Sequence, residues 1–269
     1  MFRFFSSFRR SLSGPSNTGK YLRYALGEII LVVLGILLAL QIDTWNQNRQ
    51  DRRQEQLVLT QLLDEYTSNL EQLQSKMYIR RQVIESALVL LQYRKMDPGR
   101  VDPDSFNLRL SRVITRPTFD PVLGVTNELS NSGKLYLIRN ATLRNRLTSF
   151  SSLLNEVHEE EQVIFADVQT KFTPFIREQY QLGRVLSEFL QDEAFTSHFT
   201  LSTTQDYDNI RDLFGQTDLA PILQHPDFED HLAEMLTNTI YTNQQSQGVL
   251  EKIEEILALI RGEMWEGVN

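Results

Sequence analysis

The sequence predicts an all-α fold in which one N-terminal transmembrane helix continues into an elongated antiparallel helical bundle. Residues 25–40 are apolar apart from two glycines and one glutamate, which is typical of a membrane span. Heptad rows of apolar side chains follow this span, and two later segments repeat apolar residues at helical spacing. Together these observations favour long helices that bury their apolar faces against one another.

The composition excludes several classes of function. The chain has 269 residues, of which 41% are hydrophobic and 23% are charged, as in an ordinary globular protein. Its net charge of -8 indicates no electrostatic surface for nucleic acid, which is therefore not an expected partner. The absence of cysteine excludes disulfides, thiolate metal sites and cysteine nucleophiles, and it is compatible with both oxidising and reducing compartments.

The transmembrane helix is expected over residues 21–42. At about 1.5 Å per residue its length is roughly 33 Å, which matches the hydrocarbon thickness of a bilayer. Tyr21 and Tyr24 at one end and Trp45 at the other are the expected interface anchors, because aromatic rings favour the boundary between lipid and water. Membrane lipid is therefore an expected partner.

The distribution of basic residues predicts the orientation. Five basic residues precede the apolar stretch of residues 25–40 and three follow it closely, which favours a cytoplasmic N-terminus. Residues 1–20 are then a short basic cytoplasmic segment, and residues 43–269 form a helical periplasmic domain. A cleaved signal peptide is the alternative interpretation, but no small-x-small cleavage site follows the apolar core. The basic residues are Arg3, Arg9, Arg10, Lys20 and Arg23 before the apolar stretch, and Arg49, Arg52 and Arg53 after it.

The anchor also carries a family resemblance. The string KYLRYALGEIILVVLGILLALQI at residues 20–42, followed by Trp45 and Asn46, resembles the opening of an uncharacterised family of Bacteroidota single-pass membrane proteins, a domain of unknown function. Weaker resemblance extends to residues 132–144 and to residues 225–228. The resemblance implies a bacterial inner-membrane protein, and it implies no activity, cofactor or catalytic residue.

The first helix of the bundle is expected over residues 43–95. Two heptad rows of apolar residues run along it, and Arg80 interrupts the second row. Such rows form either a coiled coil between subunits or a helix packed within one chain. We favour packing within the chain, because later segments offer matching apolar faces. The first row is Leu63, Leu70, Met77, Ile84 and Leu91, and the second is Leu59, Tyr66, Leu73 and Ala87.

Capping and turn residues divide the rest of the chain. Two further long helices are expected over residues 141–180, with a kink at Thr173-Pro174, and over residues 227–262. Residues 182–220 are the least regular part. The expected short elements are helices over residues 103–114 and 121–131, an extended or 3₁₀ connection over residues 135–138, and helical patches over residues 185–190 and 209–214.

Glu28 is the sharpest candidate for function, because a carboxylate within or near a membrane span is costly. Glu28, Gly35 and Ala39 fall on one face of a helix, and small residues on such a face permit close helix approach. This predicts a seam for association between membrane helices. Two alternatives stay open: Glu28 reaches the headgroups beside Arg23 or Lys20, or a ring of Glu28 side chains lines an ion path.

No catalytic, cofactor-binding or metal-binding residue is predicted. The four histidines form neither an HExxH motif nor a pair four residues apart, and the glycine-rich and GxSxG signatures are missing. His225 and His231 flank three acidic residues, but a spacing of six places these histidines on different helix faces.

The sequence therefore favours a non-enzymatic, membrane-anchored scaffold or accessory subunit of the bacterial envelope. It would act through protein contacts, as a homo-oligomer or with another envelope protein. The first alternative is a periplasmic ligand-sensing domain that works with a separate output partner. The second is an ion-path subunit that uses Glu28.

Overall fold

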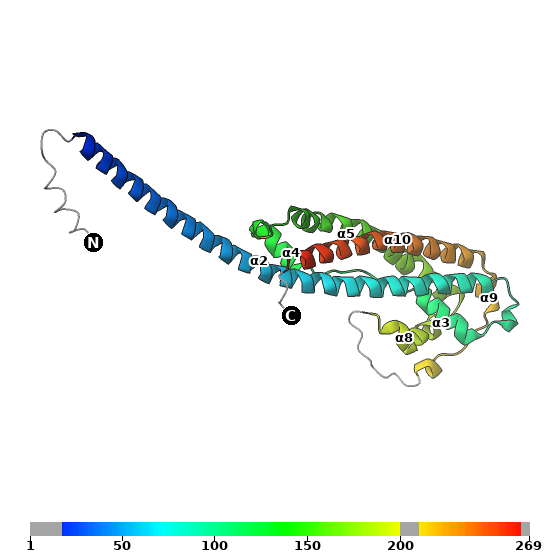
Figure 1. The fold of residues 1–269 in the computed structure, drawn as a ribbon. Helices are drawn as coiled ribbons and strands as arrows, with labels where there is room; N and C mark the ends of the chain where they lie inside the picture. Colours follow the sequence, from blue (N-terminus) through cyan, green and yellow to red (C-terminus); the bar gives the residue numbers. More distant parts are fainter. Residues whose placement is uncertain (1–17, 200–209, 265–269) are drawn as a thin grey trace. The chain divides into compact units, whose positions relative to one another are not determined.

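A computed structural model describes residues 18–199 and 210–264. All regular secondary structure within these residues is helical, so the predicted all-α fold class is confirmed (Figure 1). The chain divides into two compact units, residues 1–56 and residues 57–269. The longest helix, α2 (Thr18–Tyr93), contributes residues to both units.

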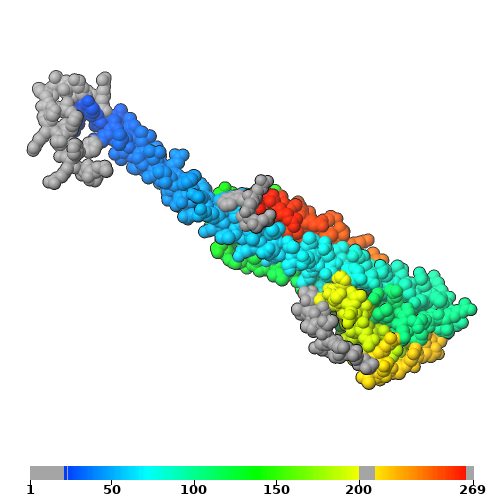
Figure 2. All heavy atoms as spheres, turned by 60° about the horizontal axis from the view of Figure 1, so that its bottom comes forward, coloured from blue at the N-terminus to red at the C-terminus, as the bar shows by residue number. Residues whose placement is uncertain are grey.

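Three long helices form the frame of the second unit (Figure 1). They are α2 from residue 57 onward, α5 (Ala141–Asp167) and α10 (Pro226–Glu263). Arg80 on α2 contacts Ser246 on α10. The later Arg94 contacts the earlier Glu229, so α10 runs antiparallel to α2, and Figure 2 shows the two helices side by side.

α2 and α5 run in the same direction. The ring of Tyr66 on α2 lies 5.3 Å from that of Phe150 on α5, and the later Arg80 meets the later Glu161. The reason is the long connection between these helices, residues 94–140, which returns along the bundle before α5 begins. Therefore α10 is antiparallel to both α2 and α5, whereas α2 and α5 are parallel to each other.

The second heptad row lies at the centre of the helix interface. The row contacts α5 and α10 of the same chain, as expected for heptads that pack within one chain. The first row is more exposed, and most of its members are only partly buried. The second row is fully buried over its apolar members, Leu59, Tyr66, Leu73 and Ala87, and Arg80 is only 1% exposed.

Two hydrophobic clusters build the core. One joins residues 59–77 of α2 to the first half of α5 and the second half of α10. The other joins the end of α2 to the first half of α10 and to the shorter helices around it. Representative members are Leu59, Leu73, Phe150 and Ile253 in the first cluster, and Val83, Phe106, Phe172 and Phe228 in the second.

A group of buried polar side chains lies on the same three long helices as the two clusters. The Arg80 guanidinium forms an ion pair with Glu161 of α5 and donates to the Ser246 hydroxyl of α10 at 2.5 Å. Glu161 also accepts the backbone N–H of Phe119, at 3.0 Å from Oε1 and 3.2 Å from Oε2. The Pro117 carbonyl lies 3.5 Å from the same guanidinium. Arg80 thus interrupts the apolar row, and its polar contacts connect α2 with α5, α10 and the loop at residues 117–119.

Short elements fill the connection between α2 and α5. They are η2 (Pro98–Arg100), α3 (Pro103–Val113), α4 (Gly124–Asn131) and η3 (Lys134–Leu137). Asp102 caps α3 by accepting the Ser105 N–H at 3.0 Å. Gly133 ends α4 with a φ of 70°, a backbone conformation that glycine adopts readily.

α4 begins at Gly124, later than the expected start at residue 121. The Asn69 side chain pairs with both backbone groups of Val122 at 2.8 Å, which holds that residue outside the helix. The Glu65 carboxylate then accepts the N–H groups of Val125 and Thr126 at 2.7 and 3.2 Å. α2 therefore supplies the cap that α4 lacks in its own sequence.

The expected kink at Thr173-Pro174 takes the form of a π-helical turn. This turn, η4 (Val168–Phe172), connects α5 to α6 (Thr173–Gln179), and the Thr173 N–H bonds to the Val168 carbonyl. Pro174 has no N–H and its ring crowds the preceding helical turn, which explains why the backbone widens just before it.

The irregular region resolves into short helices. They are α7 (Leu182–Gln191), α8 (Glu193–Thr196), η5 (Ile210–Leu213) and α9 (Ala220–Gln224). The segment from α7 to α8 packs over α3 (Figure 2).

Arg211 on η5 pairs with Asp104 on α3, which holds the pKa of that carboxyl below its usual range. A Cβ at Gly183 would lie 2.5 Å from the Phe214 ring, so a side chain at this position would force that ring to move.

Replacing Arg80 by methionine is expected to destabilise the second unit by about 3–5 kcal/mol, because Glu161 would remain buried without its charge partner. Urea unfolding followed by circular dichroism measures the change. The control is Arg81→Met, at an exposed neighbour, with an expected change within about 0.5 kcal/mol. The double variant Arg80→Met/Glu161→Leu should recover much of the lost stability. Equal effects of Arg80→Met and Arg81→Met would contradict this assignment.

Tyr66 is expected to make stability depend on alkaline pH. Burial raises the pKa of its phenol to about 12, from an ordinary value of 10.0. Because the folded pKa lies above the unfolded one, the contribution is complete below pH 10.0 and is lost as the pH rises towards 12. The Tyr66→Phe variant should show a flatter loss of urea midpoint over this range. Tyr136→Phe, at a side chain that is 70% exposed, should keep the profile of the parent protein.

Candidate functional site

The predicted association seam lies on the part of α2 that belongs to the first unit. Glu28, Gly35 and Ala39 are all exposed. A Cβ added at Gly35 would meet no heavy atom within 4 Å, so the protomer leaves this face open. The side chains of Lys20 and Arg23, which the alternative reading pairs with Glu28, lie outside the described part of the structure.

The expected interface anchors are exposed as well. The exposed fractions are 54% for Tyr21, 66% for Tyr24 and 62% for Trp45. The Arg49 guanidinium lies 5.8 Å from the centre of the Trp45 ring. An amphipathic ring beside a cation suits a position at the level of lipid headgroups. Residues 1–17 of the predicted basic segment lie outside the described residues.

One helix among the described residues, α2, is long and apolar enough to cross a membrane. None of its most apolar window is buried within the protein. An apolar surface of this length is normally shielded from water, and none of the described residues shields it here.

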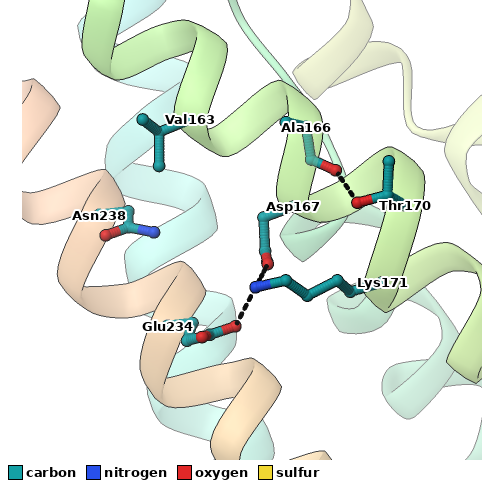
Figure 3. Close-up of a pocket in the computed structure, with 7 residues that line it drawn as sticks. All are labelled: Val163, Ala166, Asp167, Thr170, Lys171, Glu234 and Asn238. Carbon is teal, nitrogen blue, oxygen red and sulfur yellow. Dashed lines mark hydrogen bonds and ion pairs between the residues drawn. The ribbon is translucent and has the colours of Figure 1, made fainter.

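A second candidate site lies on the bundle, at the π-helical turn. Here a groove of about 360 Å³ opens between α5 and α10, and Figure 3 shows charged side chains from both sides converging in it. The Lys171 ammonium lies 2.8 Å from Asp167 Oδ1 and 3.6 Å from Glu234 Oε2. These contacts raise the pKa of Lys171, chiefly through the hydrogen bond to Asp167. The remaining lining residues are Val163, Ala166, Thr170 and Asn238.

The two carboxylates differ in their surroundings. Asp167 is only 6% exposed, and its Oδ2 oxygen has no hydrogen-bond partner among the described residues. The Glu234 side chain is 50% exposed. A buried carboxylate oxygen without a donor is costly, so Asp167 retains capacity to bind a further cation or donor.

His231 joins the same cluster. One ligand atom from each of Asp167, His231 and Glu234 can be chosen so that all three lie within 4.8 Å of one another. The imidazole stacks on the Phe172 ring at 4.9 Å and lies 4.8 Å from that of Phe175. These aromatic contacts fix the plane of the histidine ring.

The sequence alone drew attention to the acidic residues next to His231 and did not bring Asp167, His231 and Glu234 together. Glu234 follows His231 by three residues, a spacing that places both on one helix face and was a usable signal. Asp167 comes from another helix, and only the fold brings it near. His225 takes a different role, because its Nδ1 accepts the Asp227 N–H at 3.2 Å and caps α10.

No protein-family model matches this chain, and no curated protein or solved structure matches it either.

Proposed function

We propose that this protein is a non-enzymatic, membrane-anchored helical scaffold or accessory subunit of the bacterial envelope, acting through protein contacts. The observation that carries the proposal is the uncovered apolar stretch of α2, which is attached to a separate, well-packed helical unit. Lipid is the natural cover for such a stretch. The bundle then serves as the part that meets other proteins.

The proposed location is the inner membrane, with the N-terminus in the cytoplasm and the bundle in the periplasm. Two observations support it: the excess of basic residues before the span and the resemblance of residues 20–42 to an inner-membrane family. The seam of Glu28, Gly35 and Ala39 is the proposed contact between copies of the membrane helix, because its small residues allow close approach.

Orientation can be tested cleanly because the chain contains no cysteine. A membrane-impermeant maleimide applied to spheroplasts should label Ser152→Cys, at an exposed position on α5. Ser13→Cys, before the span, should react only after lysis. The reverse pattern would invert the proposed orientation, and labelling of both in intact spheroplasts would exclude a retained span.

Association can be tested with glycine variants of the full-length chain in mild detergent. Gly35→Ile should weaken self-association about tenfold or more, measured as mass by light scattering against concentration. Gly27→Ile is the matched control, because this glycine is equally open but lies on a different helix face. Both substitutions should leave the bundle folded. An unchanged mass for Gly35→Ile, or an equal loss for both variants, rules the seam out.

A further inference from the structure

We propose that Asp167, His231 and Glu234 form a binding site for a divalent transition-metal ion, and that the Lys171 ammonium occupies this site when no metal is bound. The proposal concerns the bundle alone and is independent of the membrane seam. It starts from the convergence of one histidine and two carboxylates beside the π-helical turn.

The chemistry of the donors selects the class of metal. The cluster offers one imidazole nitrogen and two carboxylate oxygens, a mixture that suits Zn²⁺ and related first-row ions. Mg²⁺ and Ca²⁺ prefer oxygen donors throughout, so the histidine counts against them. Three protein ligands leave a coordination position open for water or a further ligand.

The geometry requires only a small adjustment. Zinc bonds of about 2.1 Å in a tetrahedral arrangement separate donor atoms by roughly 3.4 Å, whereas the present donors lie within 4.8 Å. Glu234 supplies most of the movement, because its side chain is half exposed and free to change rotamer. Asp167 is held by burial, and His231 is held by its contacts with Phe172 and Phe175.

Two of the three proposed ligand residues carry buried polar atoms that have no hydrogen-bond partner among the described residues. Asp167 is more than nine-tenths buried, and its Oδ2 oxygen has no hydrogen-bond partner within the described ranges. The Nδ1 nitrogen of His231 is also buried without a partner there. A buried polar atom without a partner calls for an explanation, and a bound ion is one such explanation.

Lys171 provides an internal cation that the metal would replace. Its ammonium lies between the carboxylates of Asp167 and Glu234, where a cation is electrostatically favoured (Figure 3). The Lys171 side chain is 56% exposed, so it can swing into solvent without opening the core. Metal affinity is therefore set by competition with this lysine.

The test uses the full-length protein in detergent, stripped with a chelator and titrated with Zn²⁺ by calorimetry. We expect one equivalent to bind, and Zn²⁺ to raise the unfolding temperature. Glu234→Gln and His231→Phe should each weaken binding about tenfold or more, and His231→Phe preserves the ring contacts. Asp230→Asn, at an exposed neighbour, removes the same charge as Glu234→Gln and should change affinity less than about twofold. Equal affinities in Glu234→Gln and Asp230→Asn, or no binding by the parent protein, overturn the site.

Lys171→Met tests the competition directly. This variant should bind Zn²⁺ several-fold more tightly than the parent protein, because no ammonium has to leave. An affinity equal to or below that of the parent overturns the proposed role of the lysine. Mg²⁺ at a thousandfold excess should not displace Zn²⁺, and displacement would show that the imidazole is not a ligand. Co²⁺ should give a visible d–d spectrum in the parent protein that His231→Phe alters.

Discussion

The buried ion pair between Arg80 and Glu161 is the constraint on which the bundle depends. Removing two charges from water costs several kcal/mol per ion, and the cost is offset only when every partner is in place. The apolar heptad rows alone tolerate a slip of seven residues, because each row then meets an equivalent row. A slip would leave Arg80 opposite an apolar side chain. The pair, together with Ser246, therefore fixes the register of three helices at once.

The same logic extends along the buried face of α2. Glu65 and Asn69 lie on this helix yet satisfy backbone groups in the segment before and at the start of α4. Each forms bonds that the short connecting segment cannot form within itself. As a result, α2 acts as a template that holds the return connection in place. This connection in turn permits α2 and α5 to run in the same direction, an arrangement that adjacent helices with a short link do not reach.

Periodicity and capping residues predicted the long helices, because both signals are local in the sequence. Partners of buried polar residues could not be predicted in this way. Arg80 was visible as an interruption of the second heptad row, but its contacts Glu161 and Ser246 lie 81 and 166 residues further along the chain. The late start of α4 had the same origin, since it depends on Asn69. For the proposed metal site, the spacing of His231 and Glu234 was visible in the sequence, whereas Asp167 could not be included without knowing which helix faces α10.

The π-helical turn relates this fold to its proposed chemistry. A proline within a long helix forces the backbone to widen, and the widened turn lies between Asp167 and Pro174. Lys171 projects from the turn toward the carboxylates, so the cation that neutralises the groove is part of the protein. A permanently structural metal site gains nothing from such an internal competitor, because the competitor only lowers its affinity. A site that binds and releases metal as the metal concentration changes benefits from the lysine, because the metal-free protein keeps the carboxylate charges paired. The bundle then stays folded in both states. Reversible occupancy is therefore the behaviour that this arrangement favours.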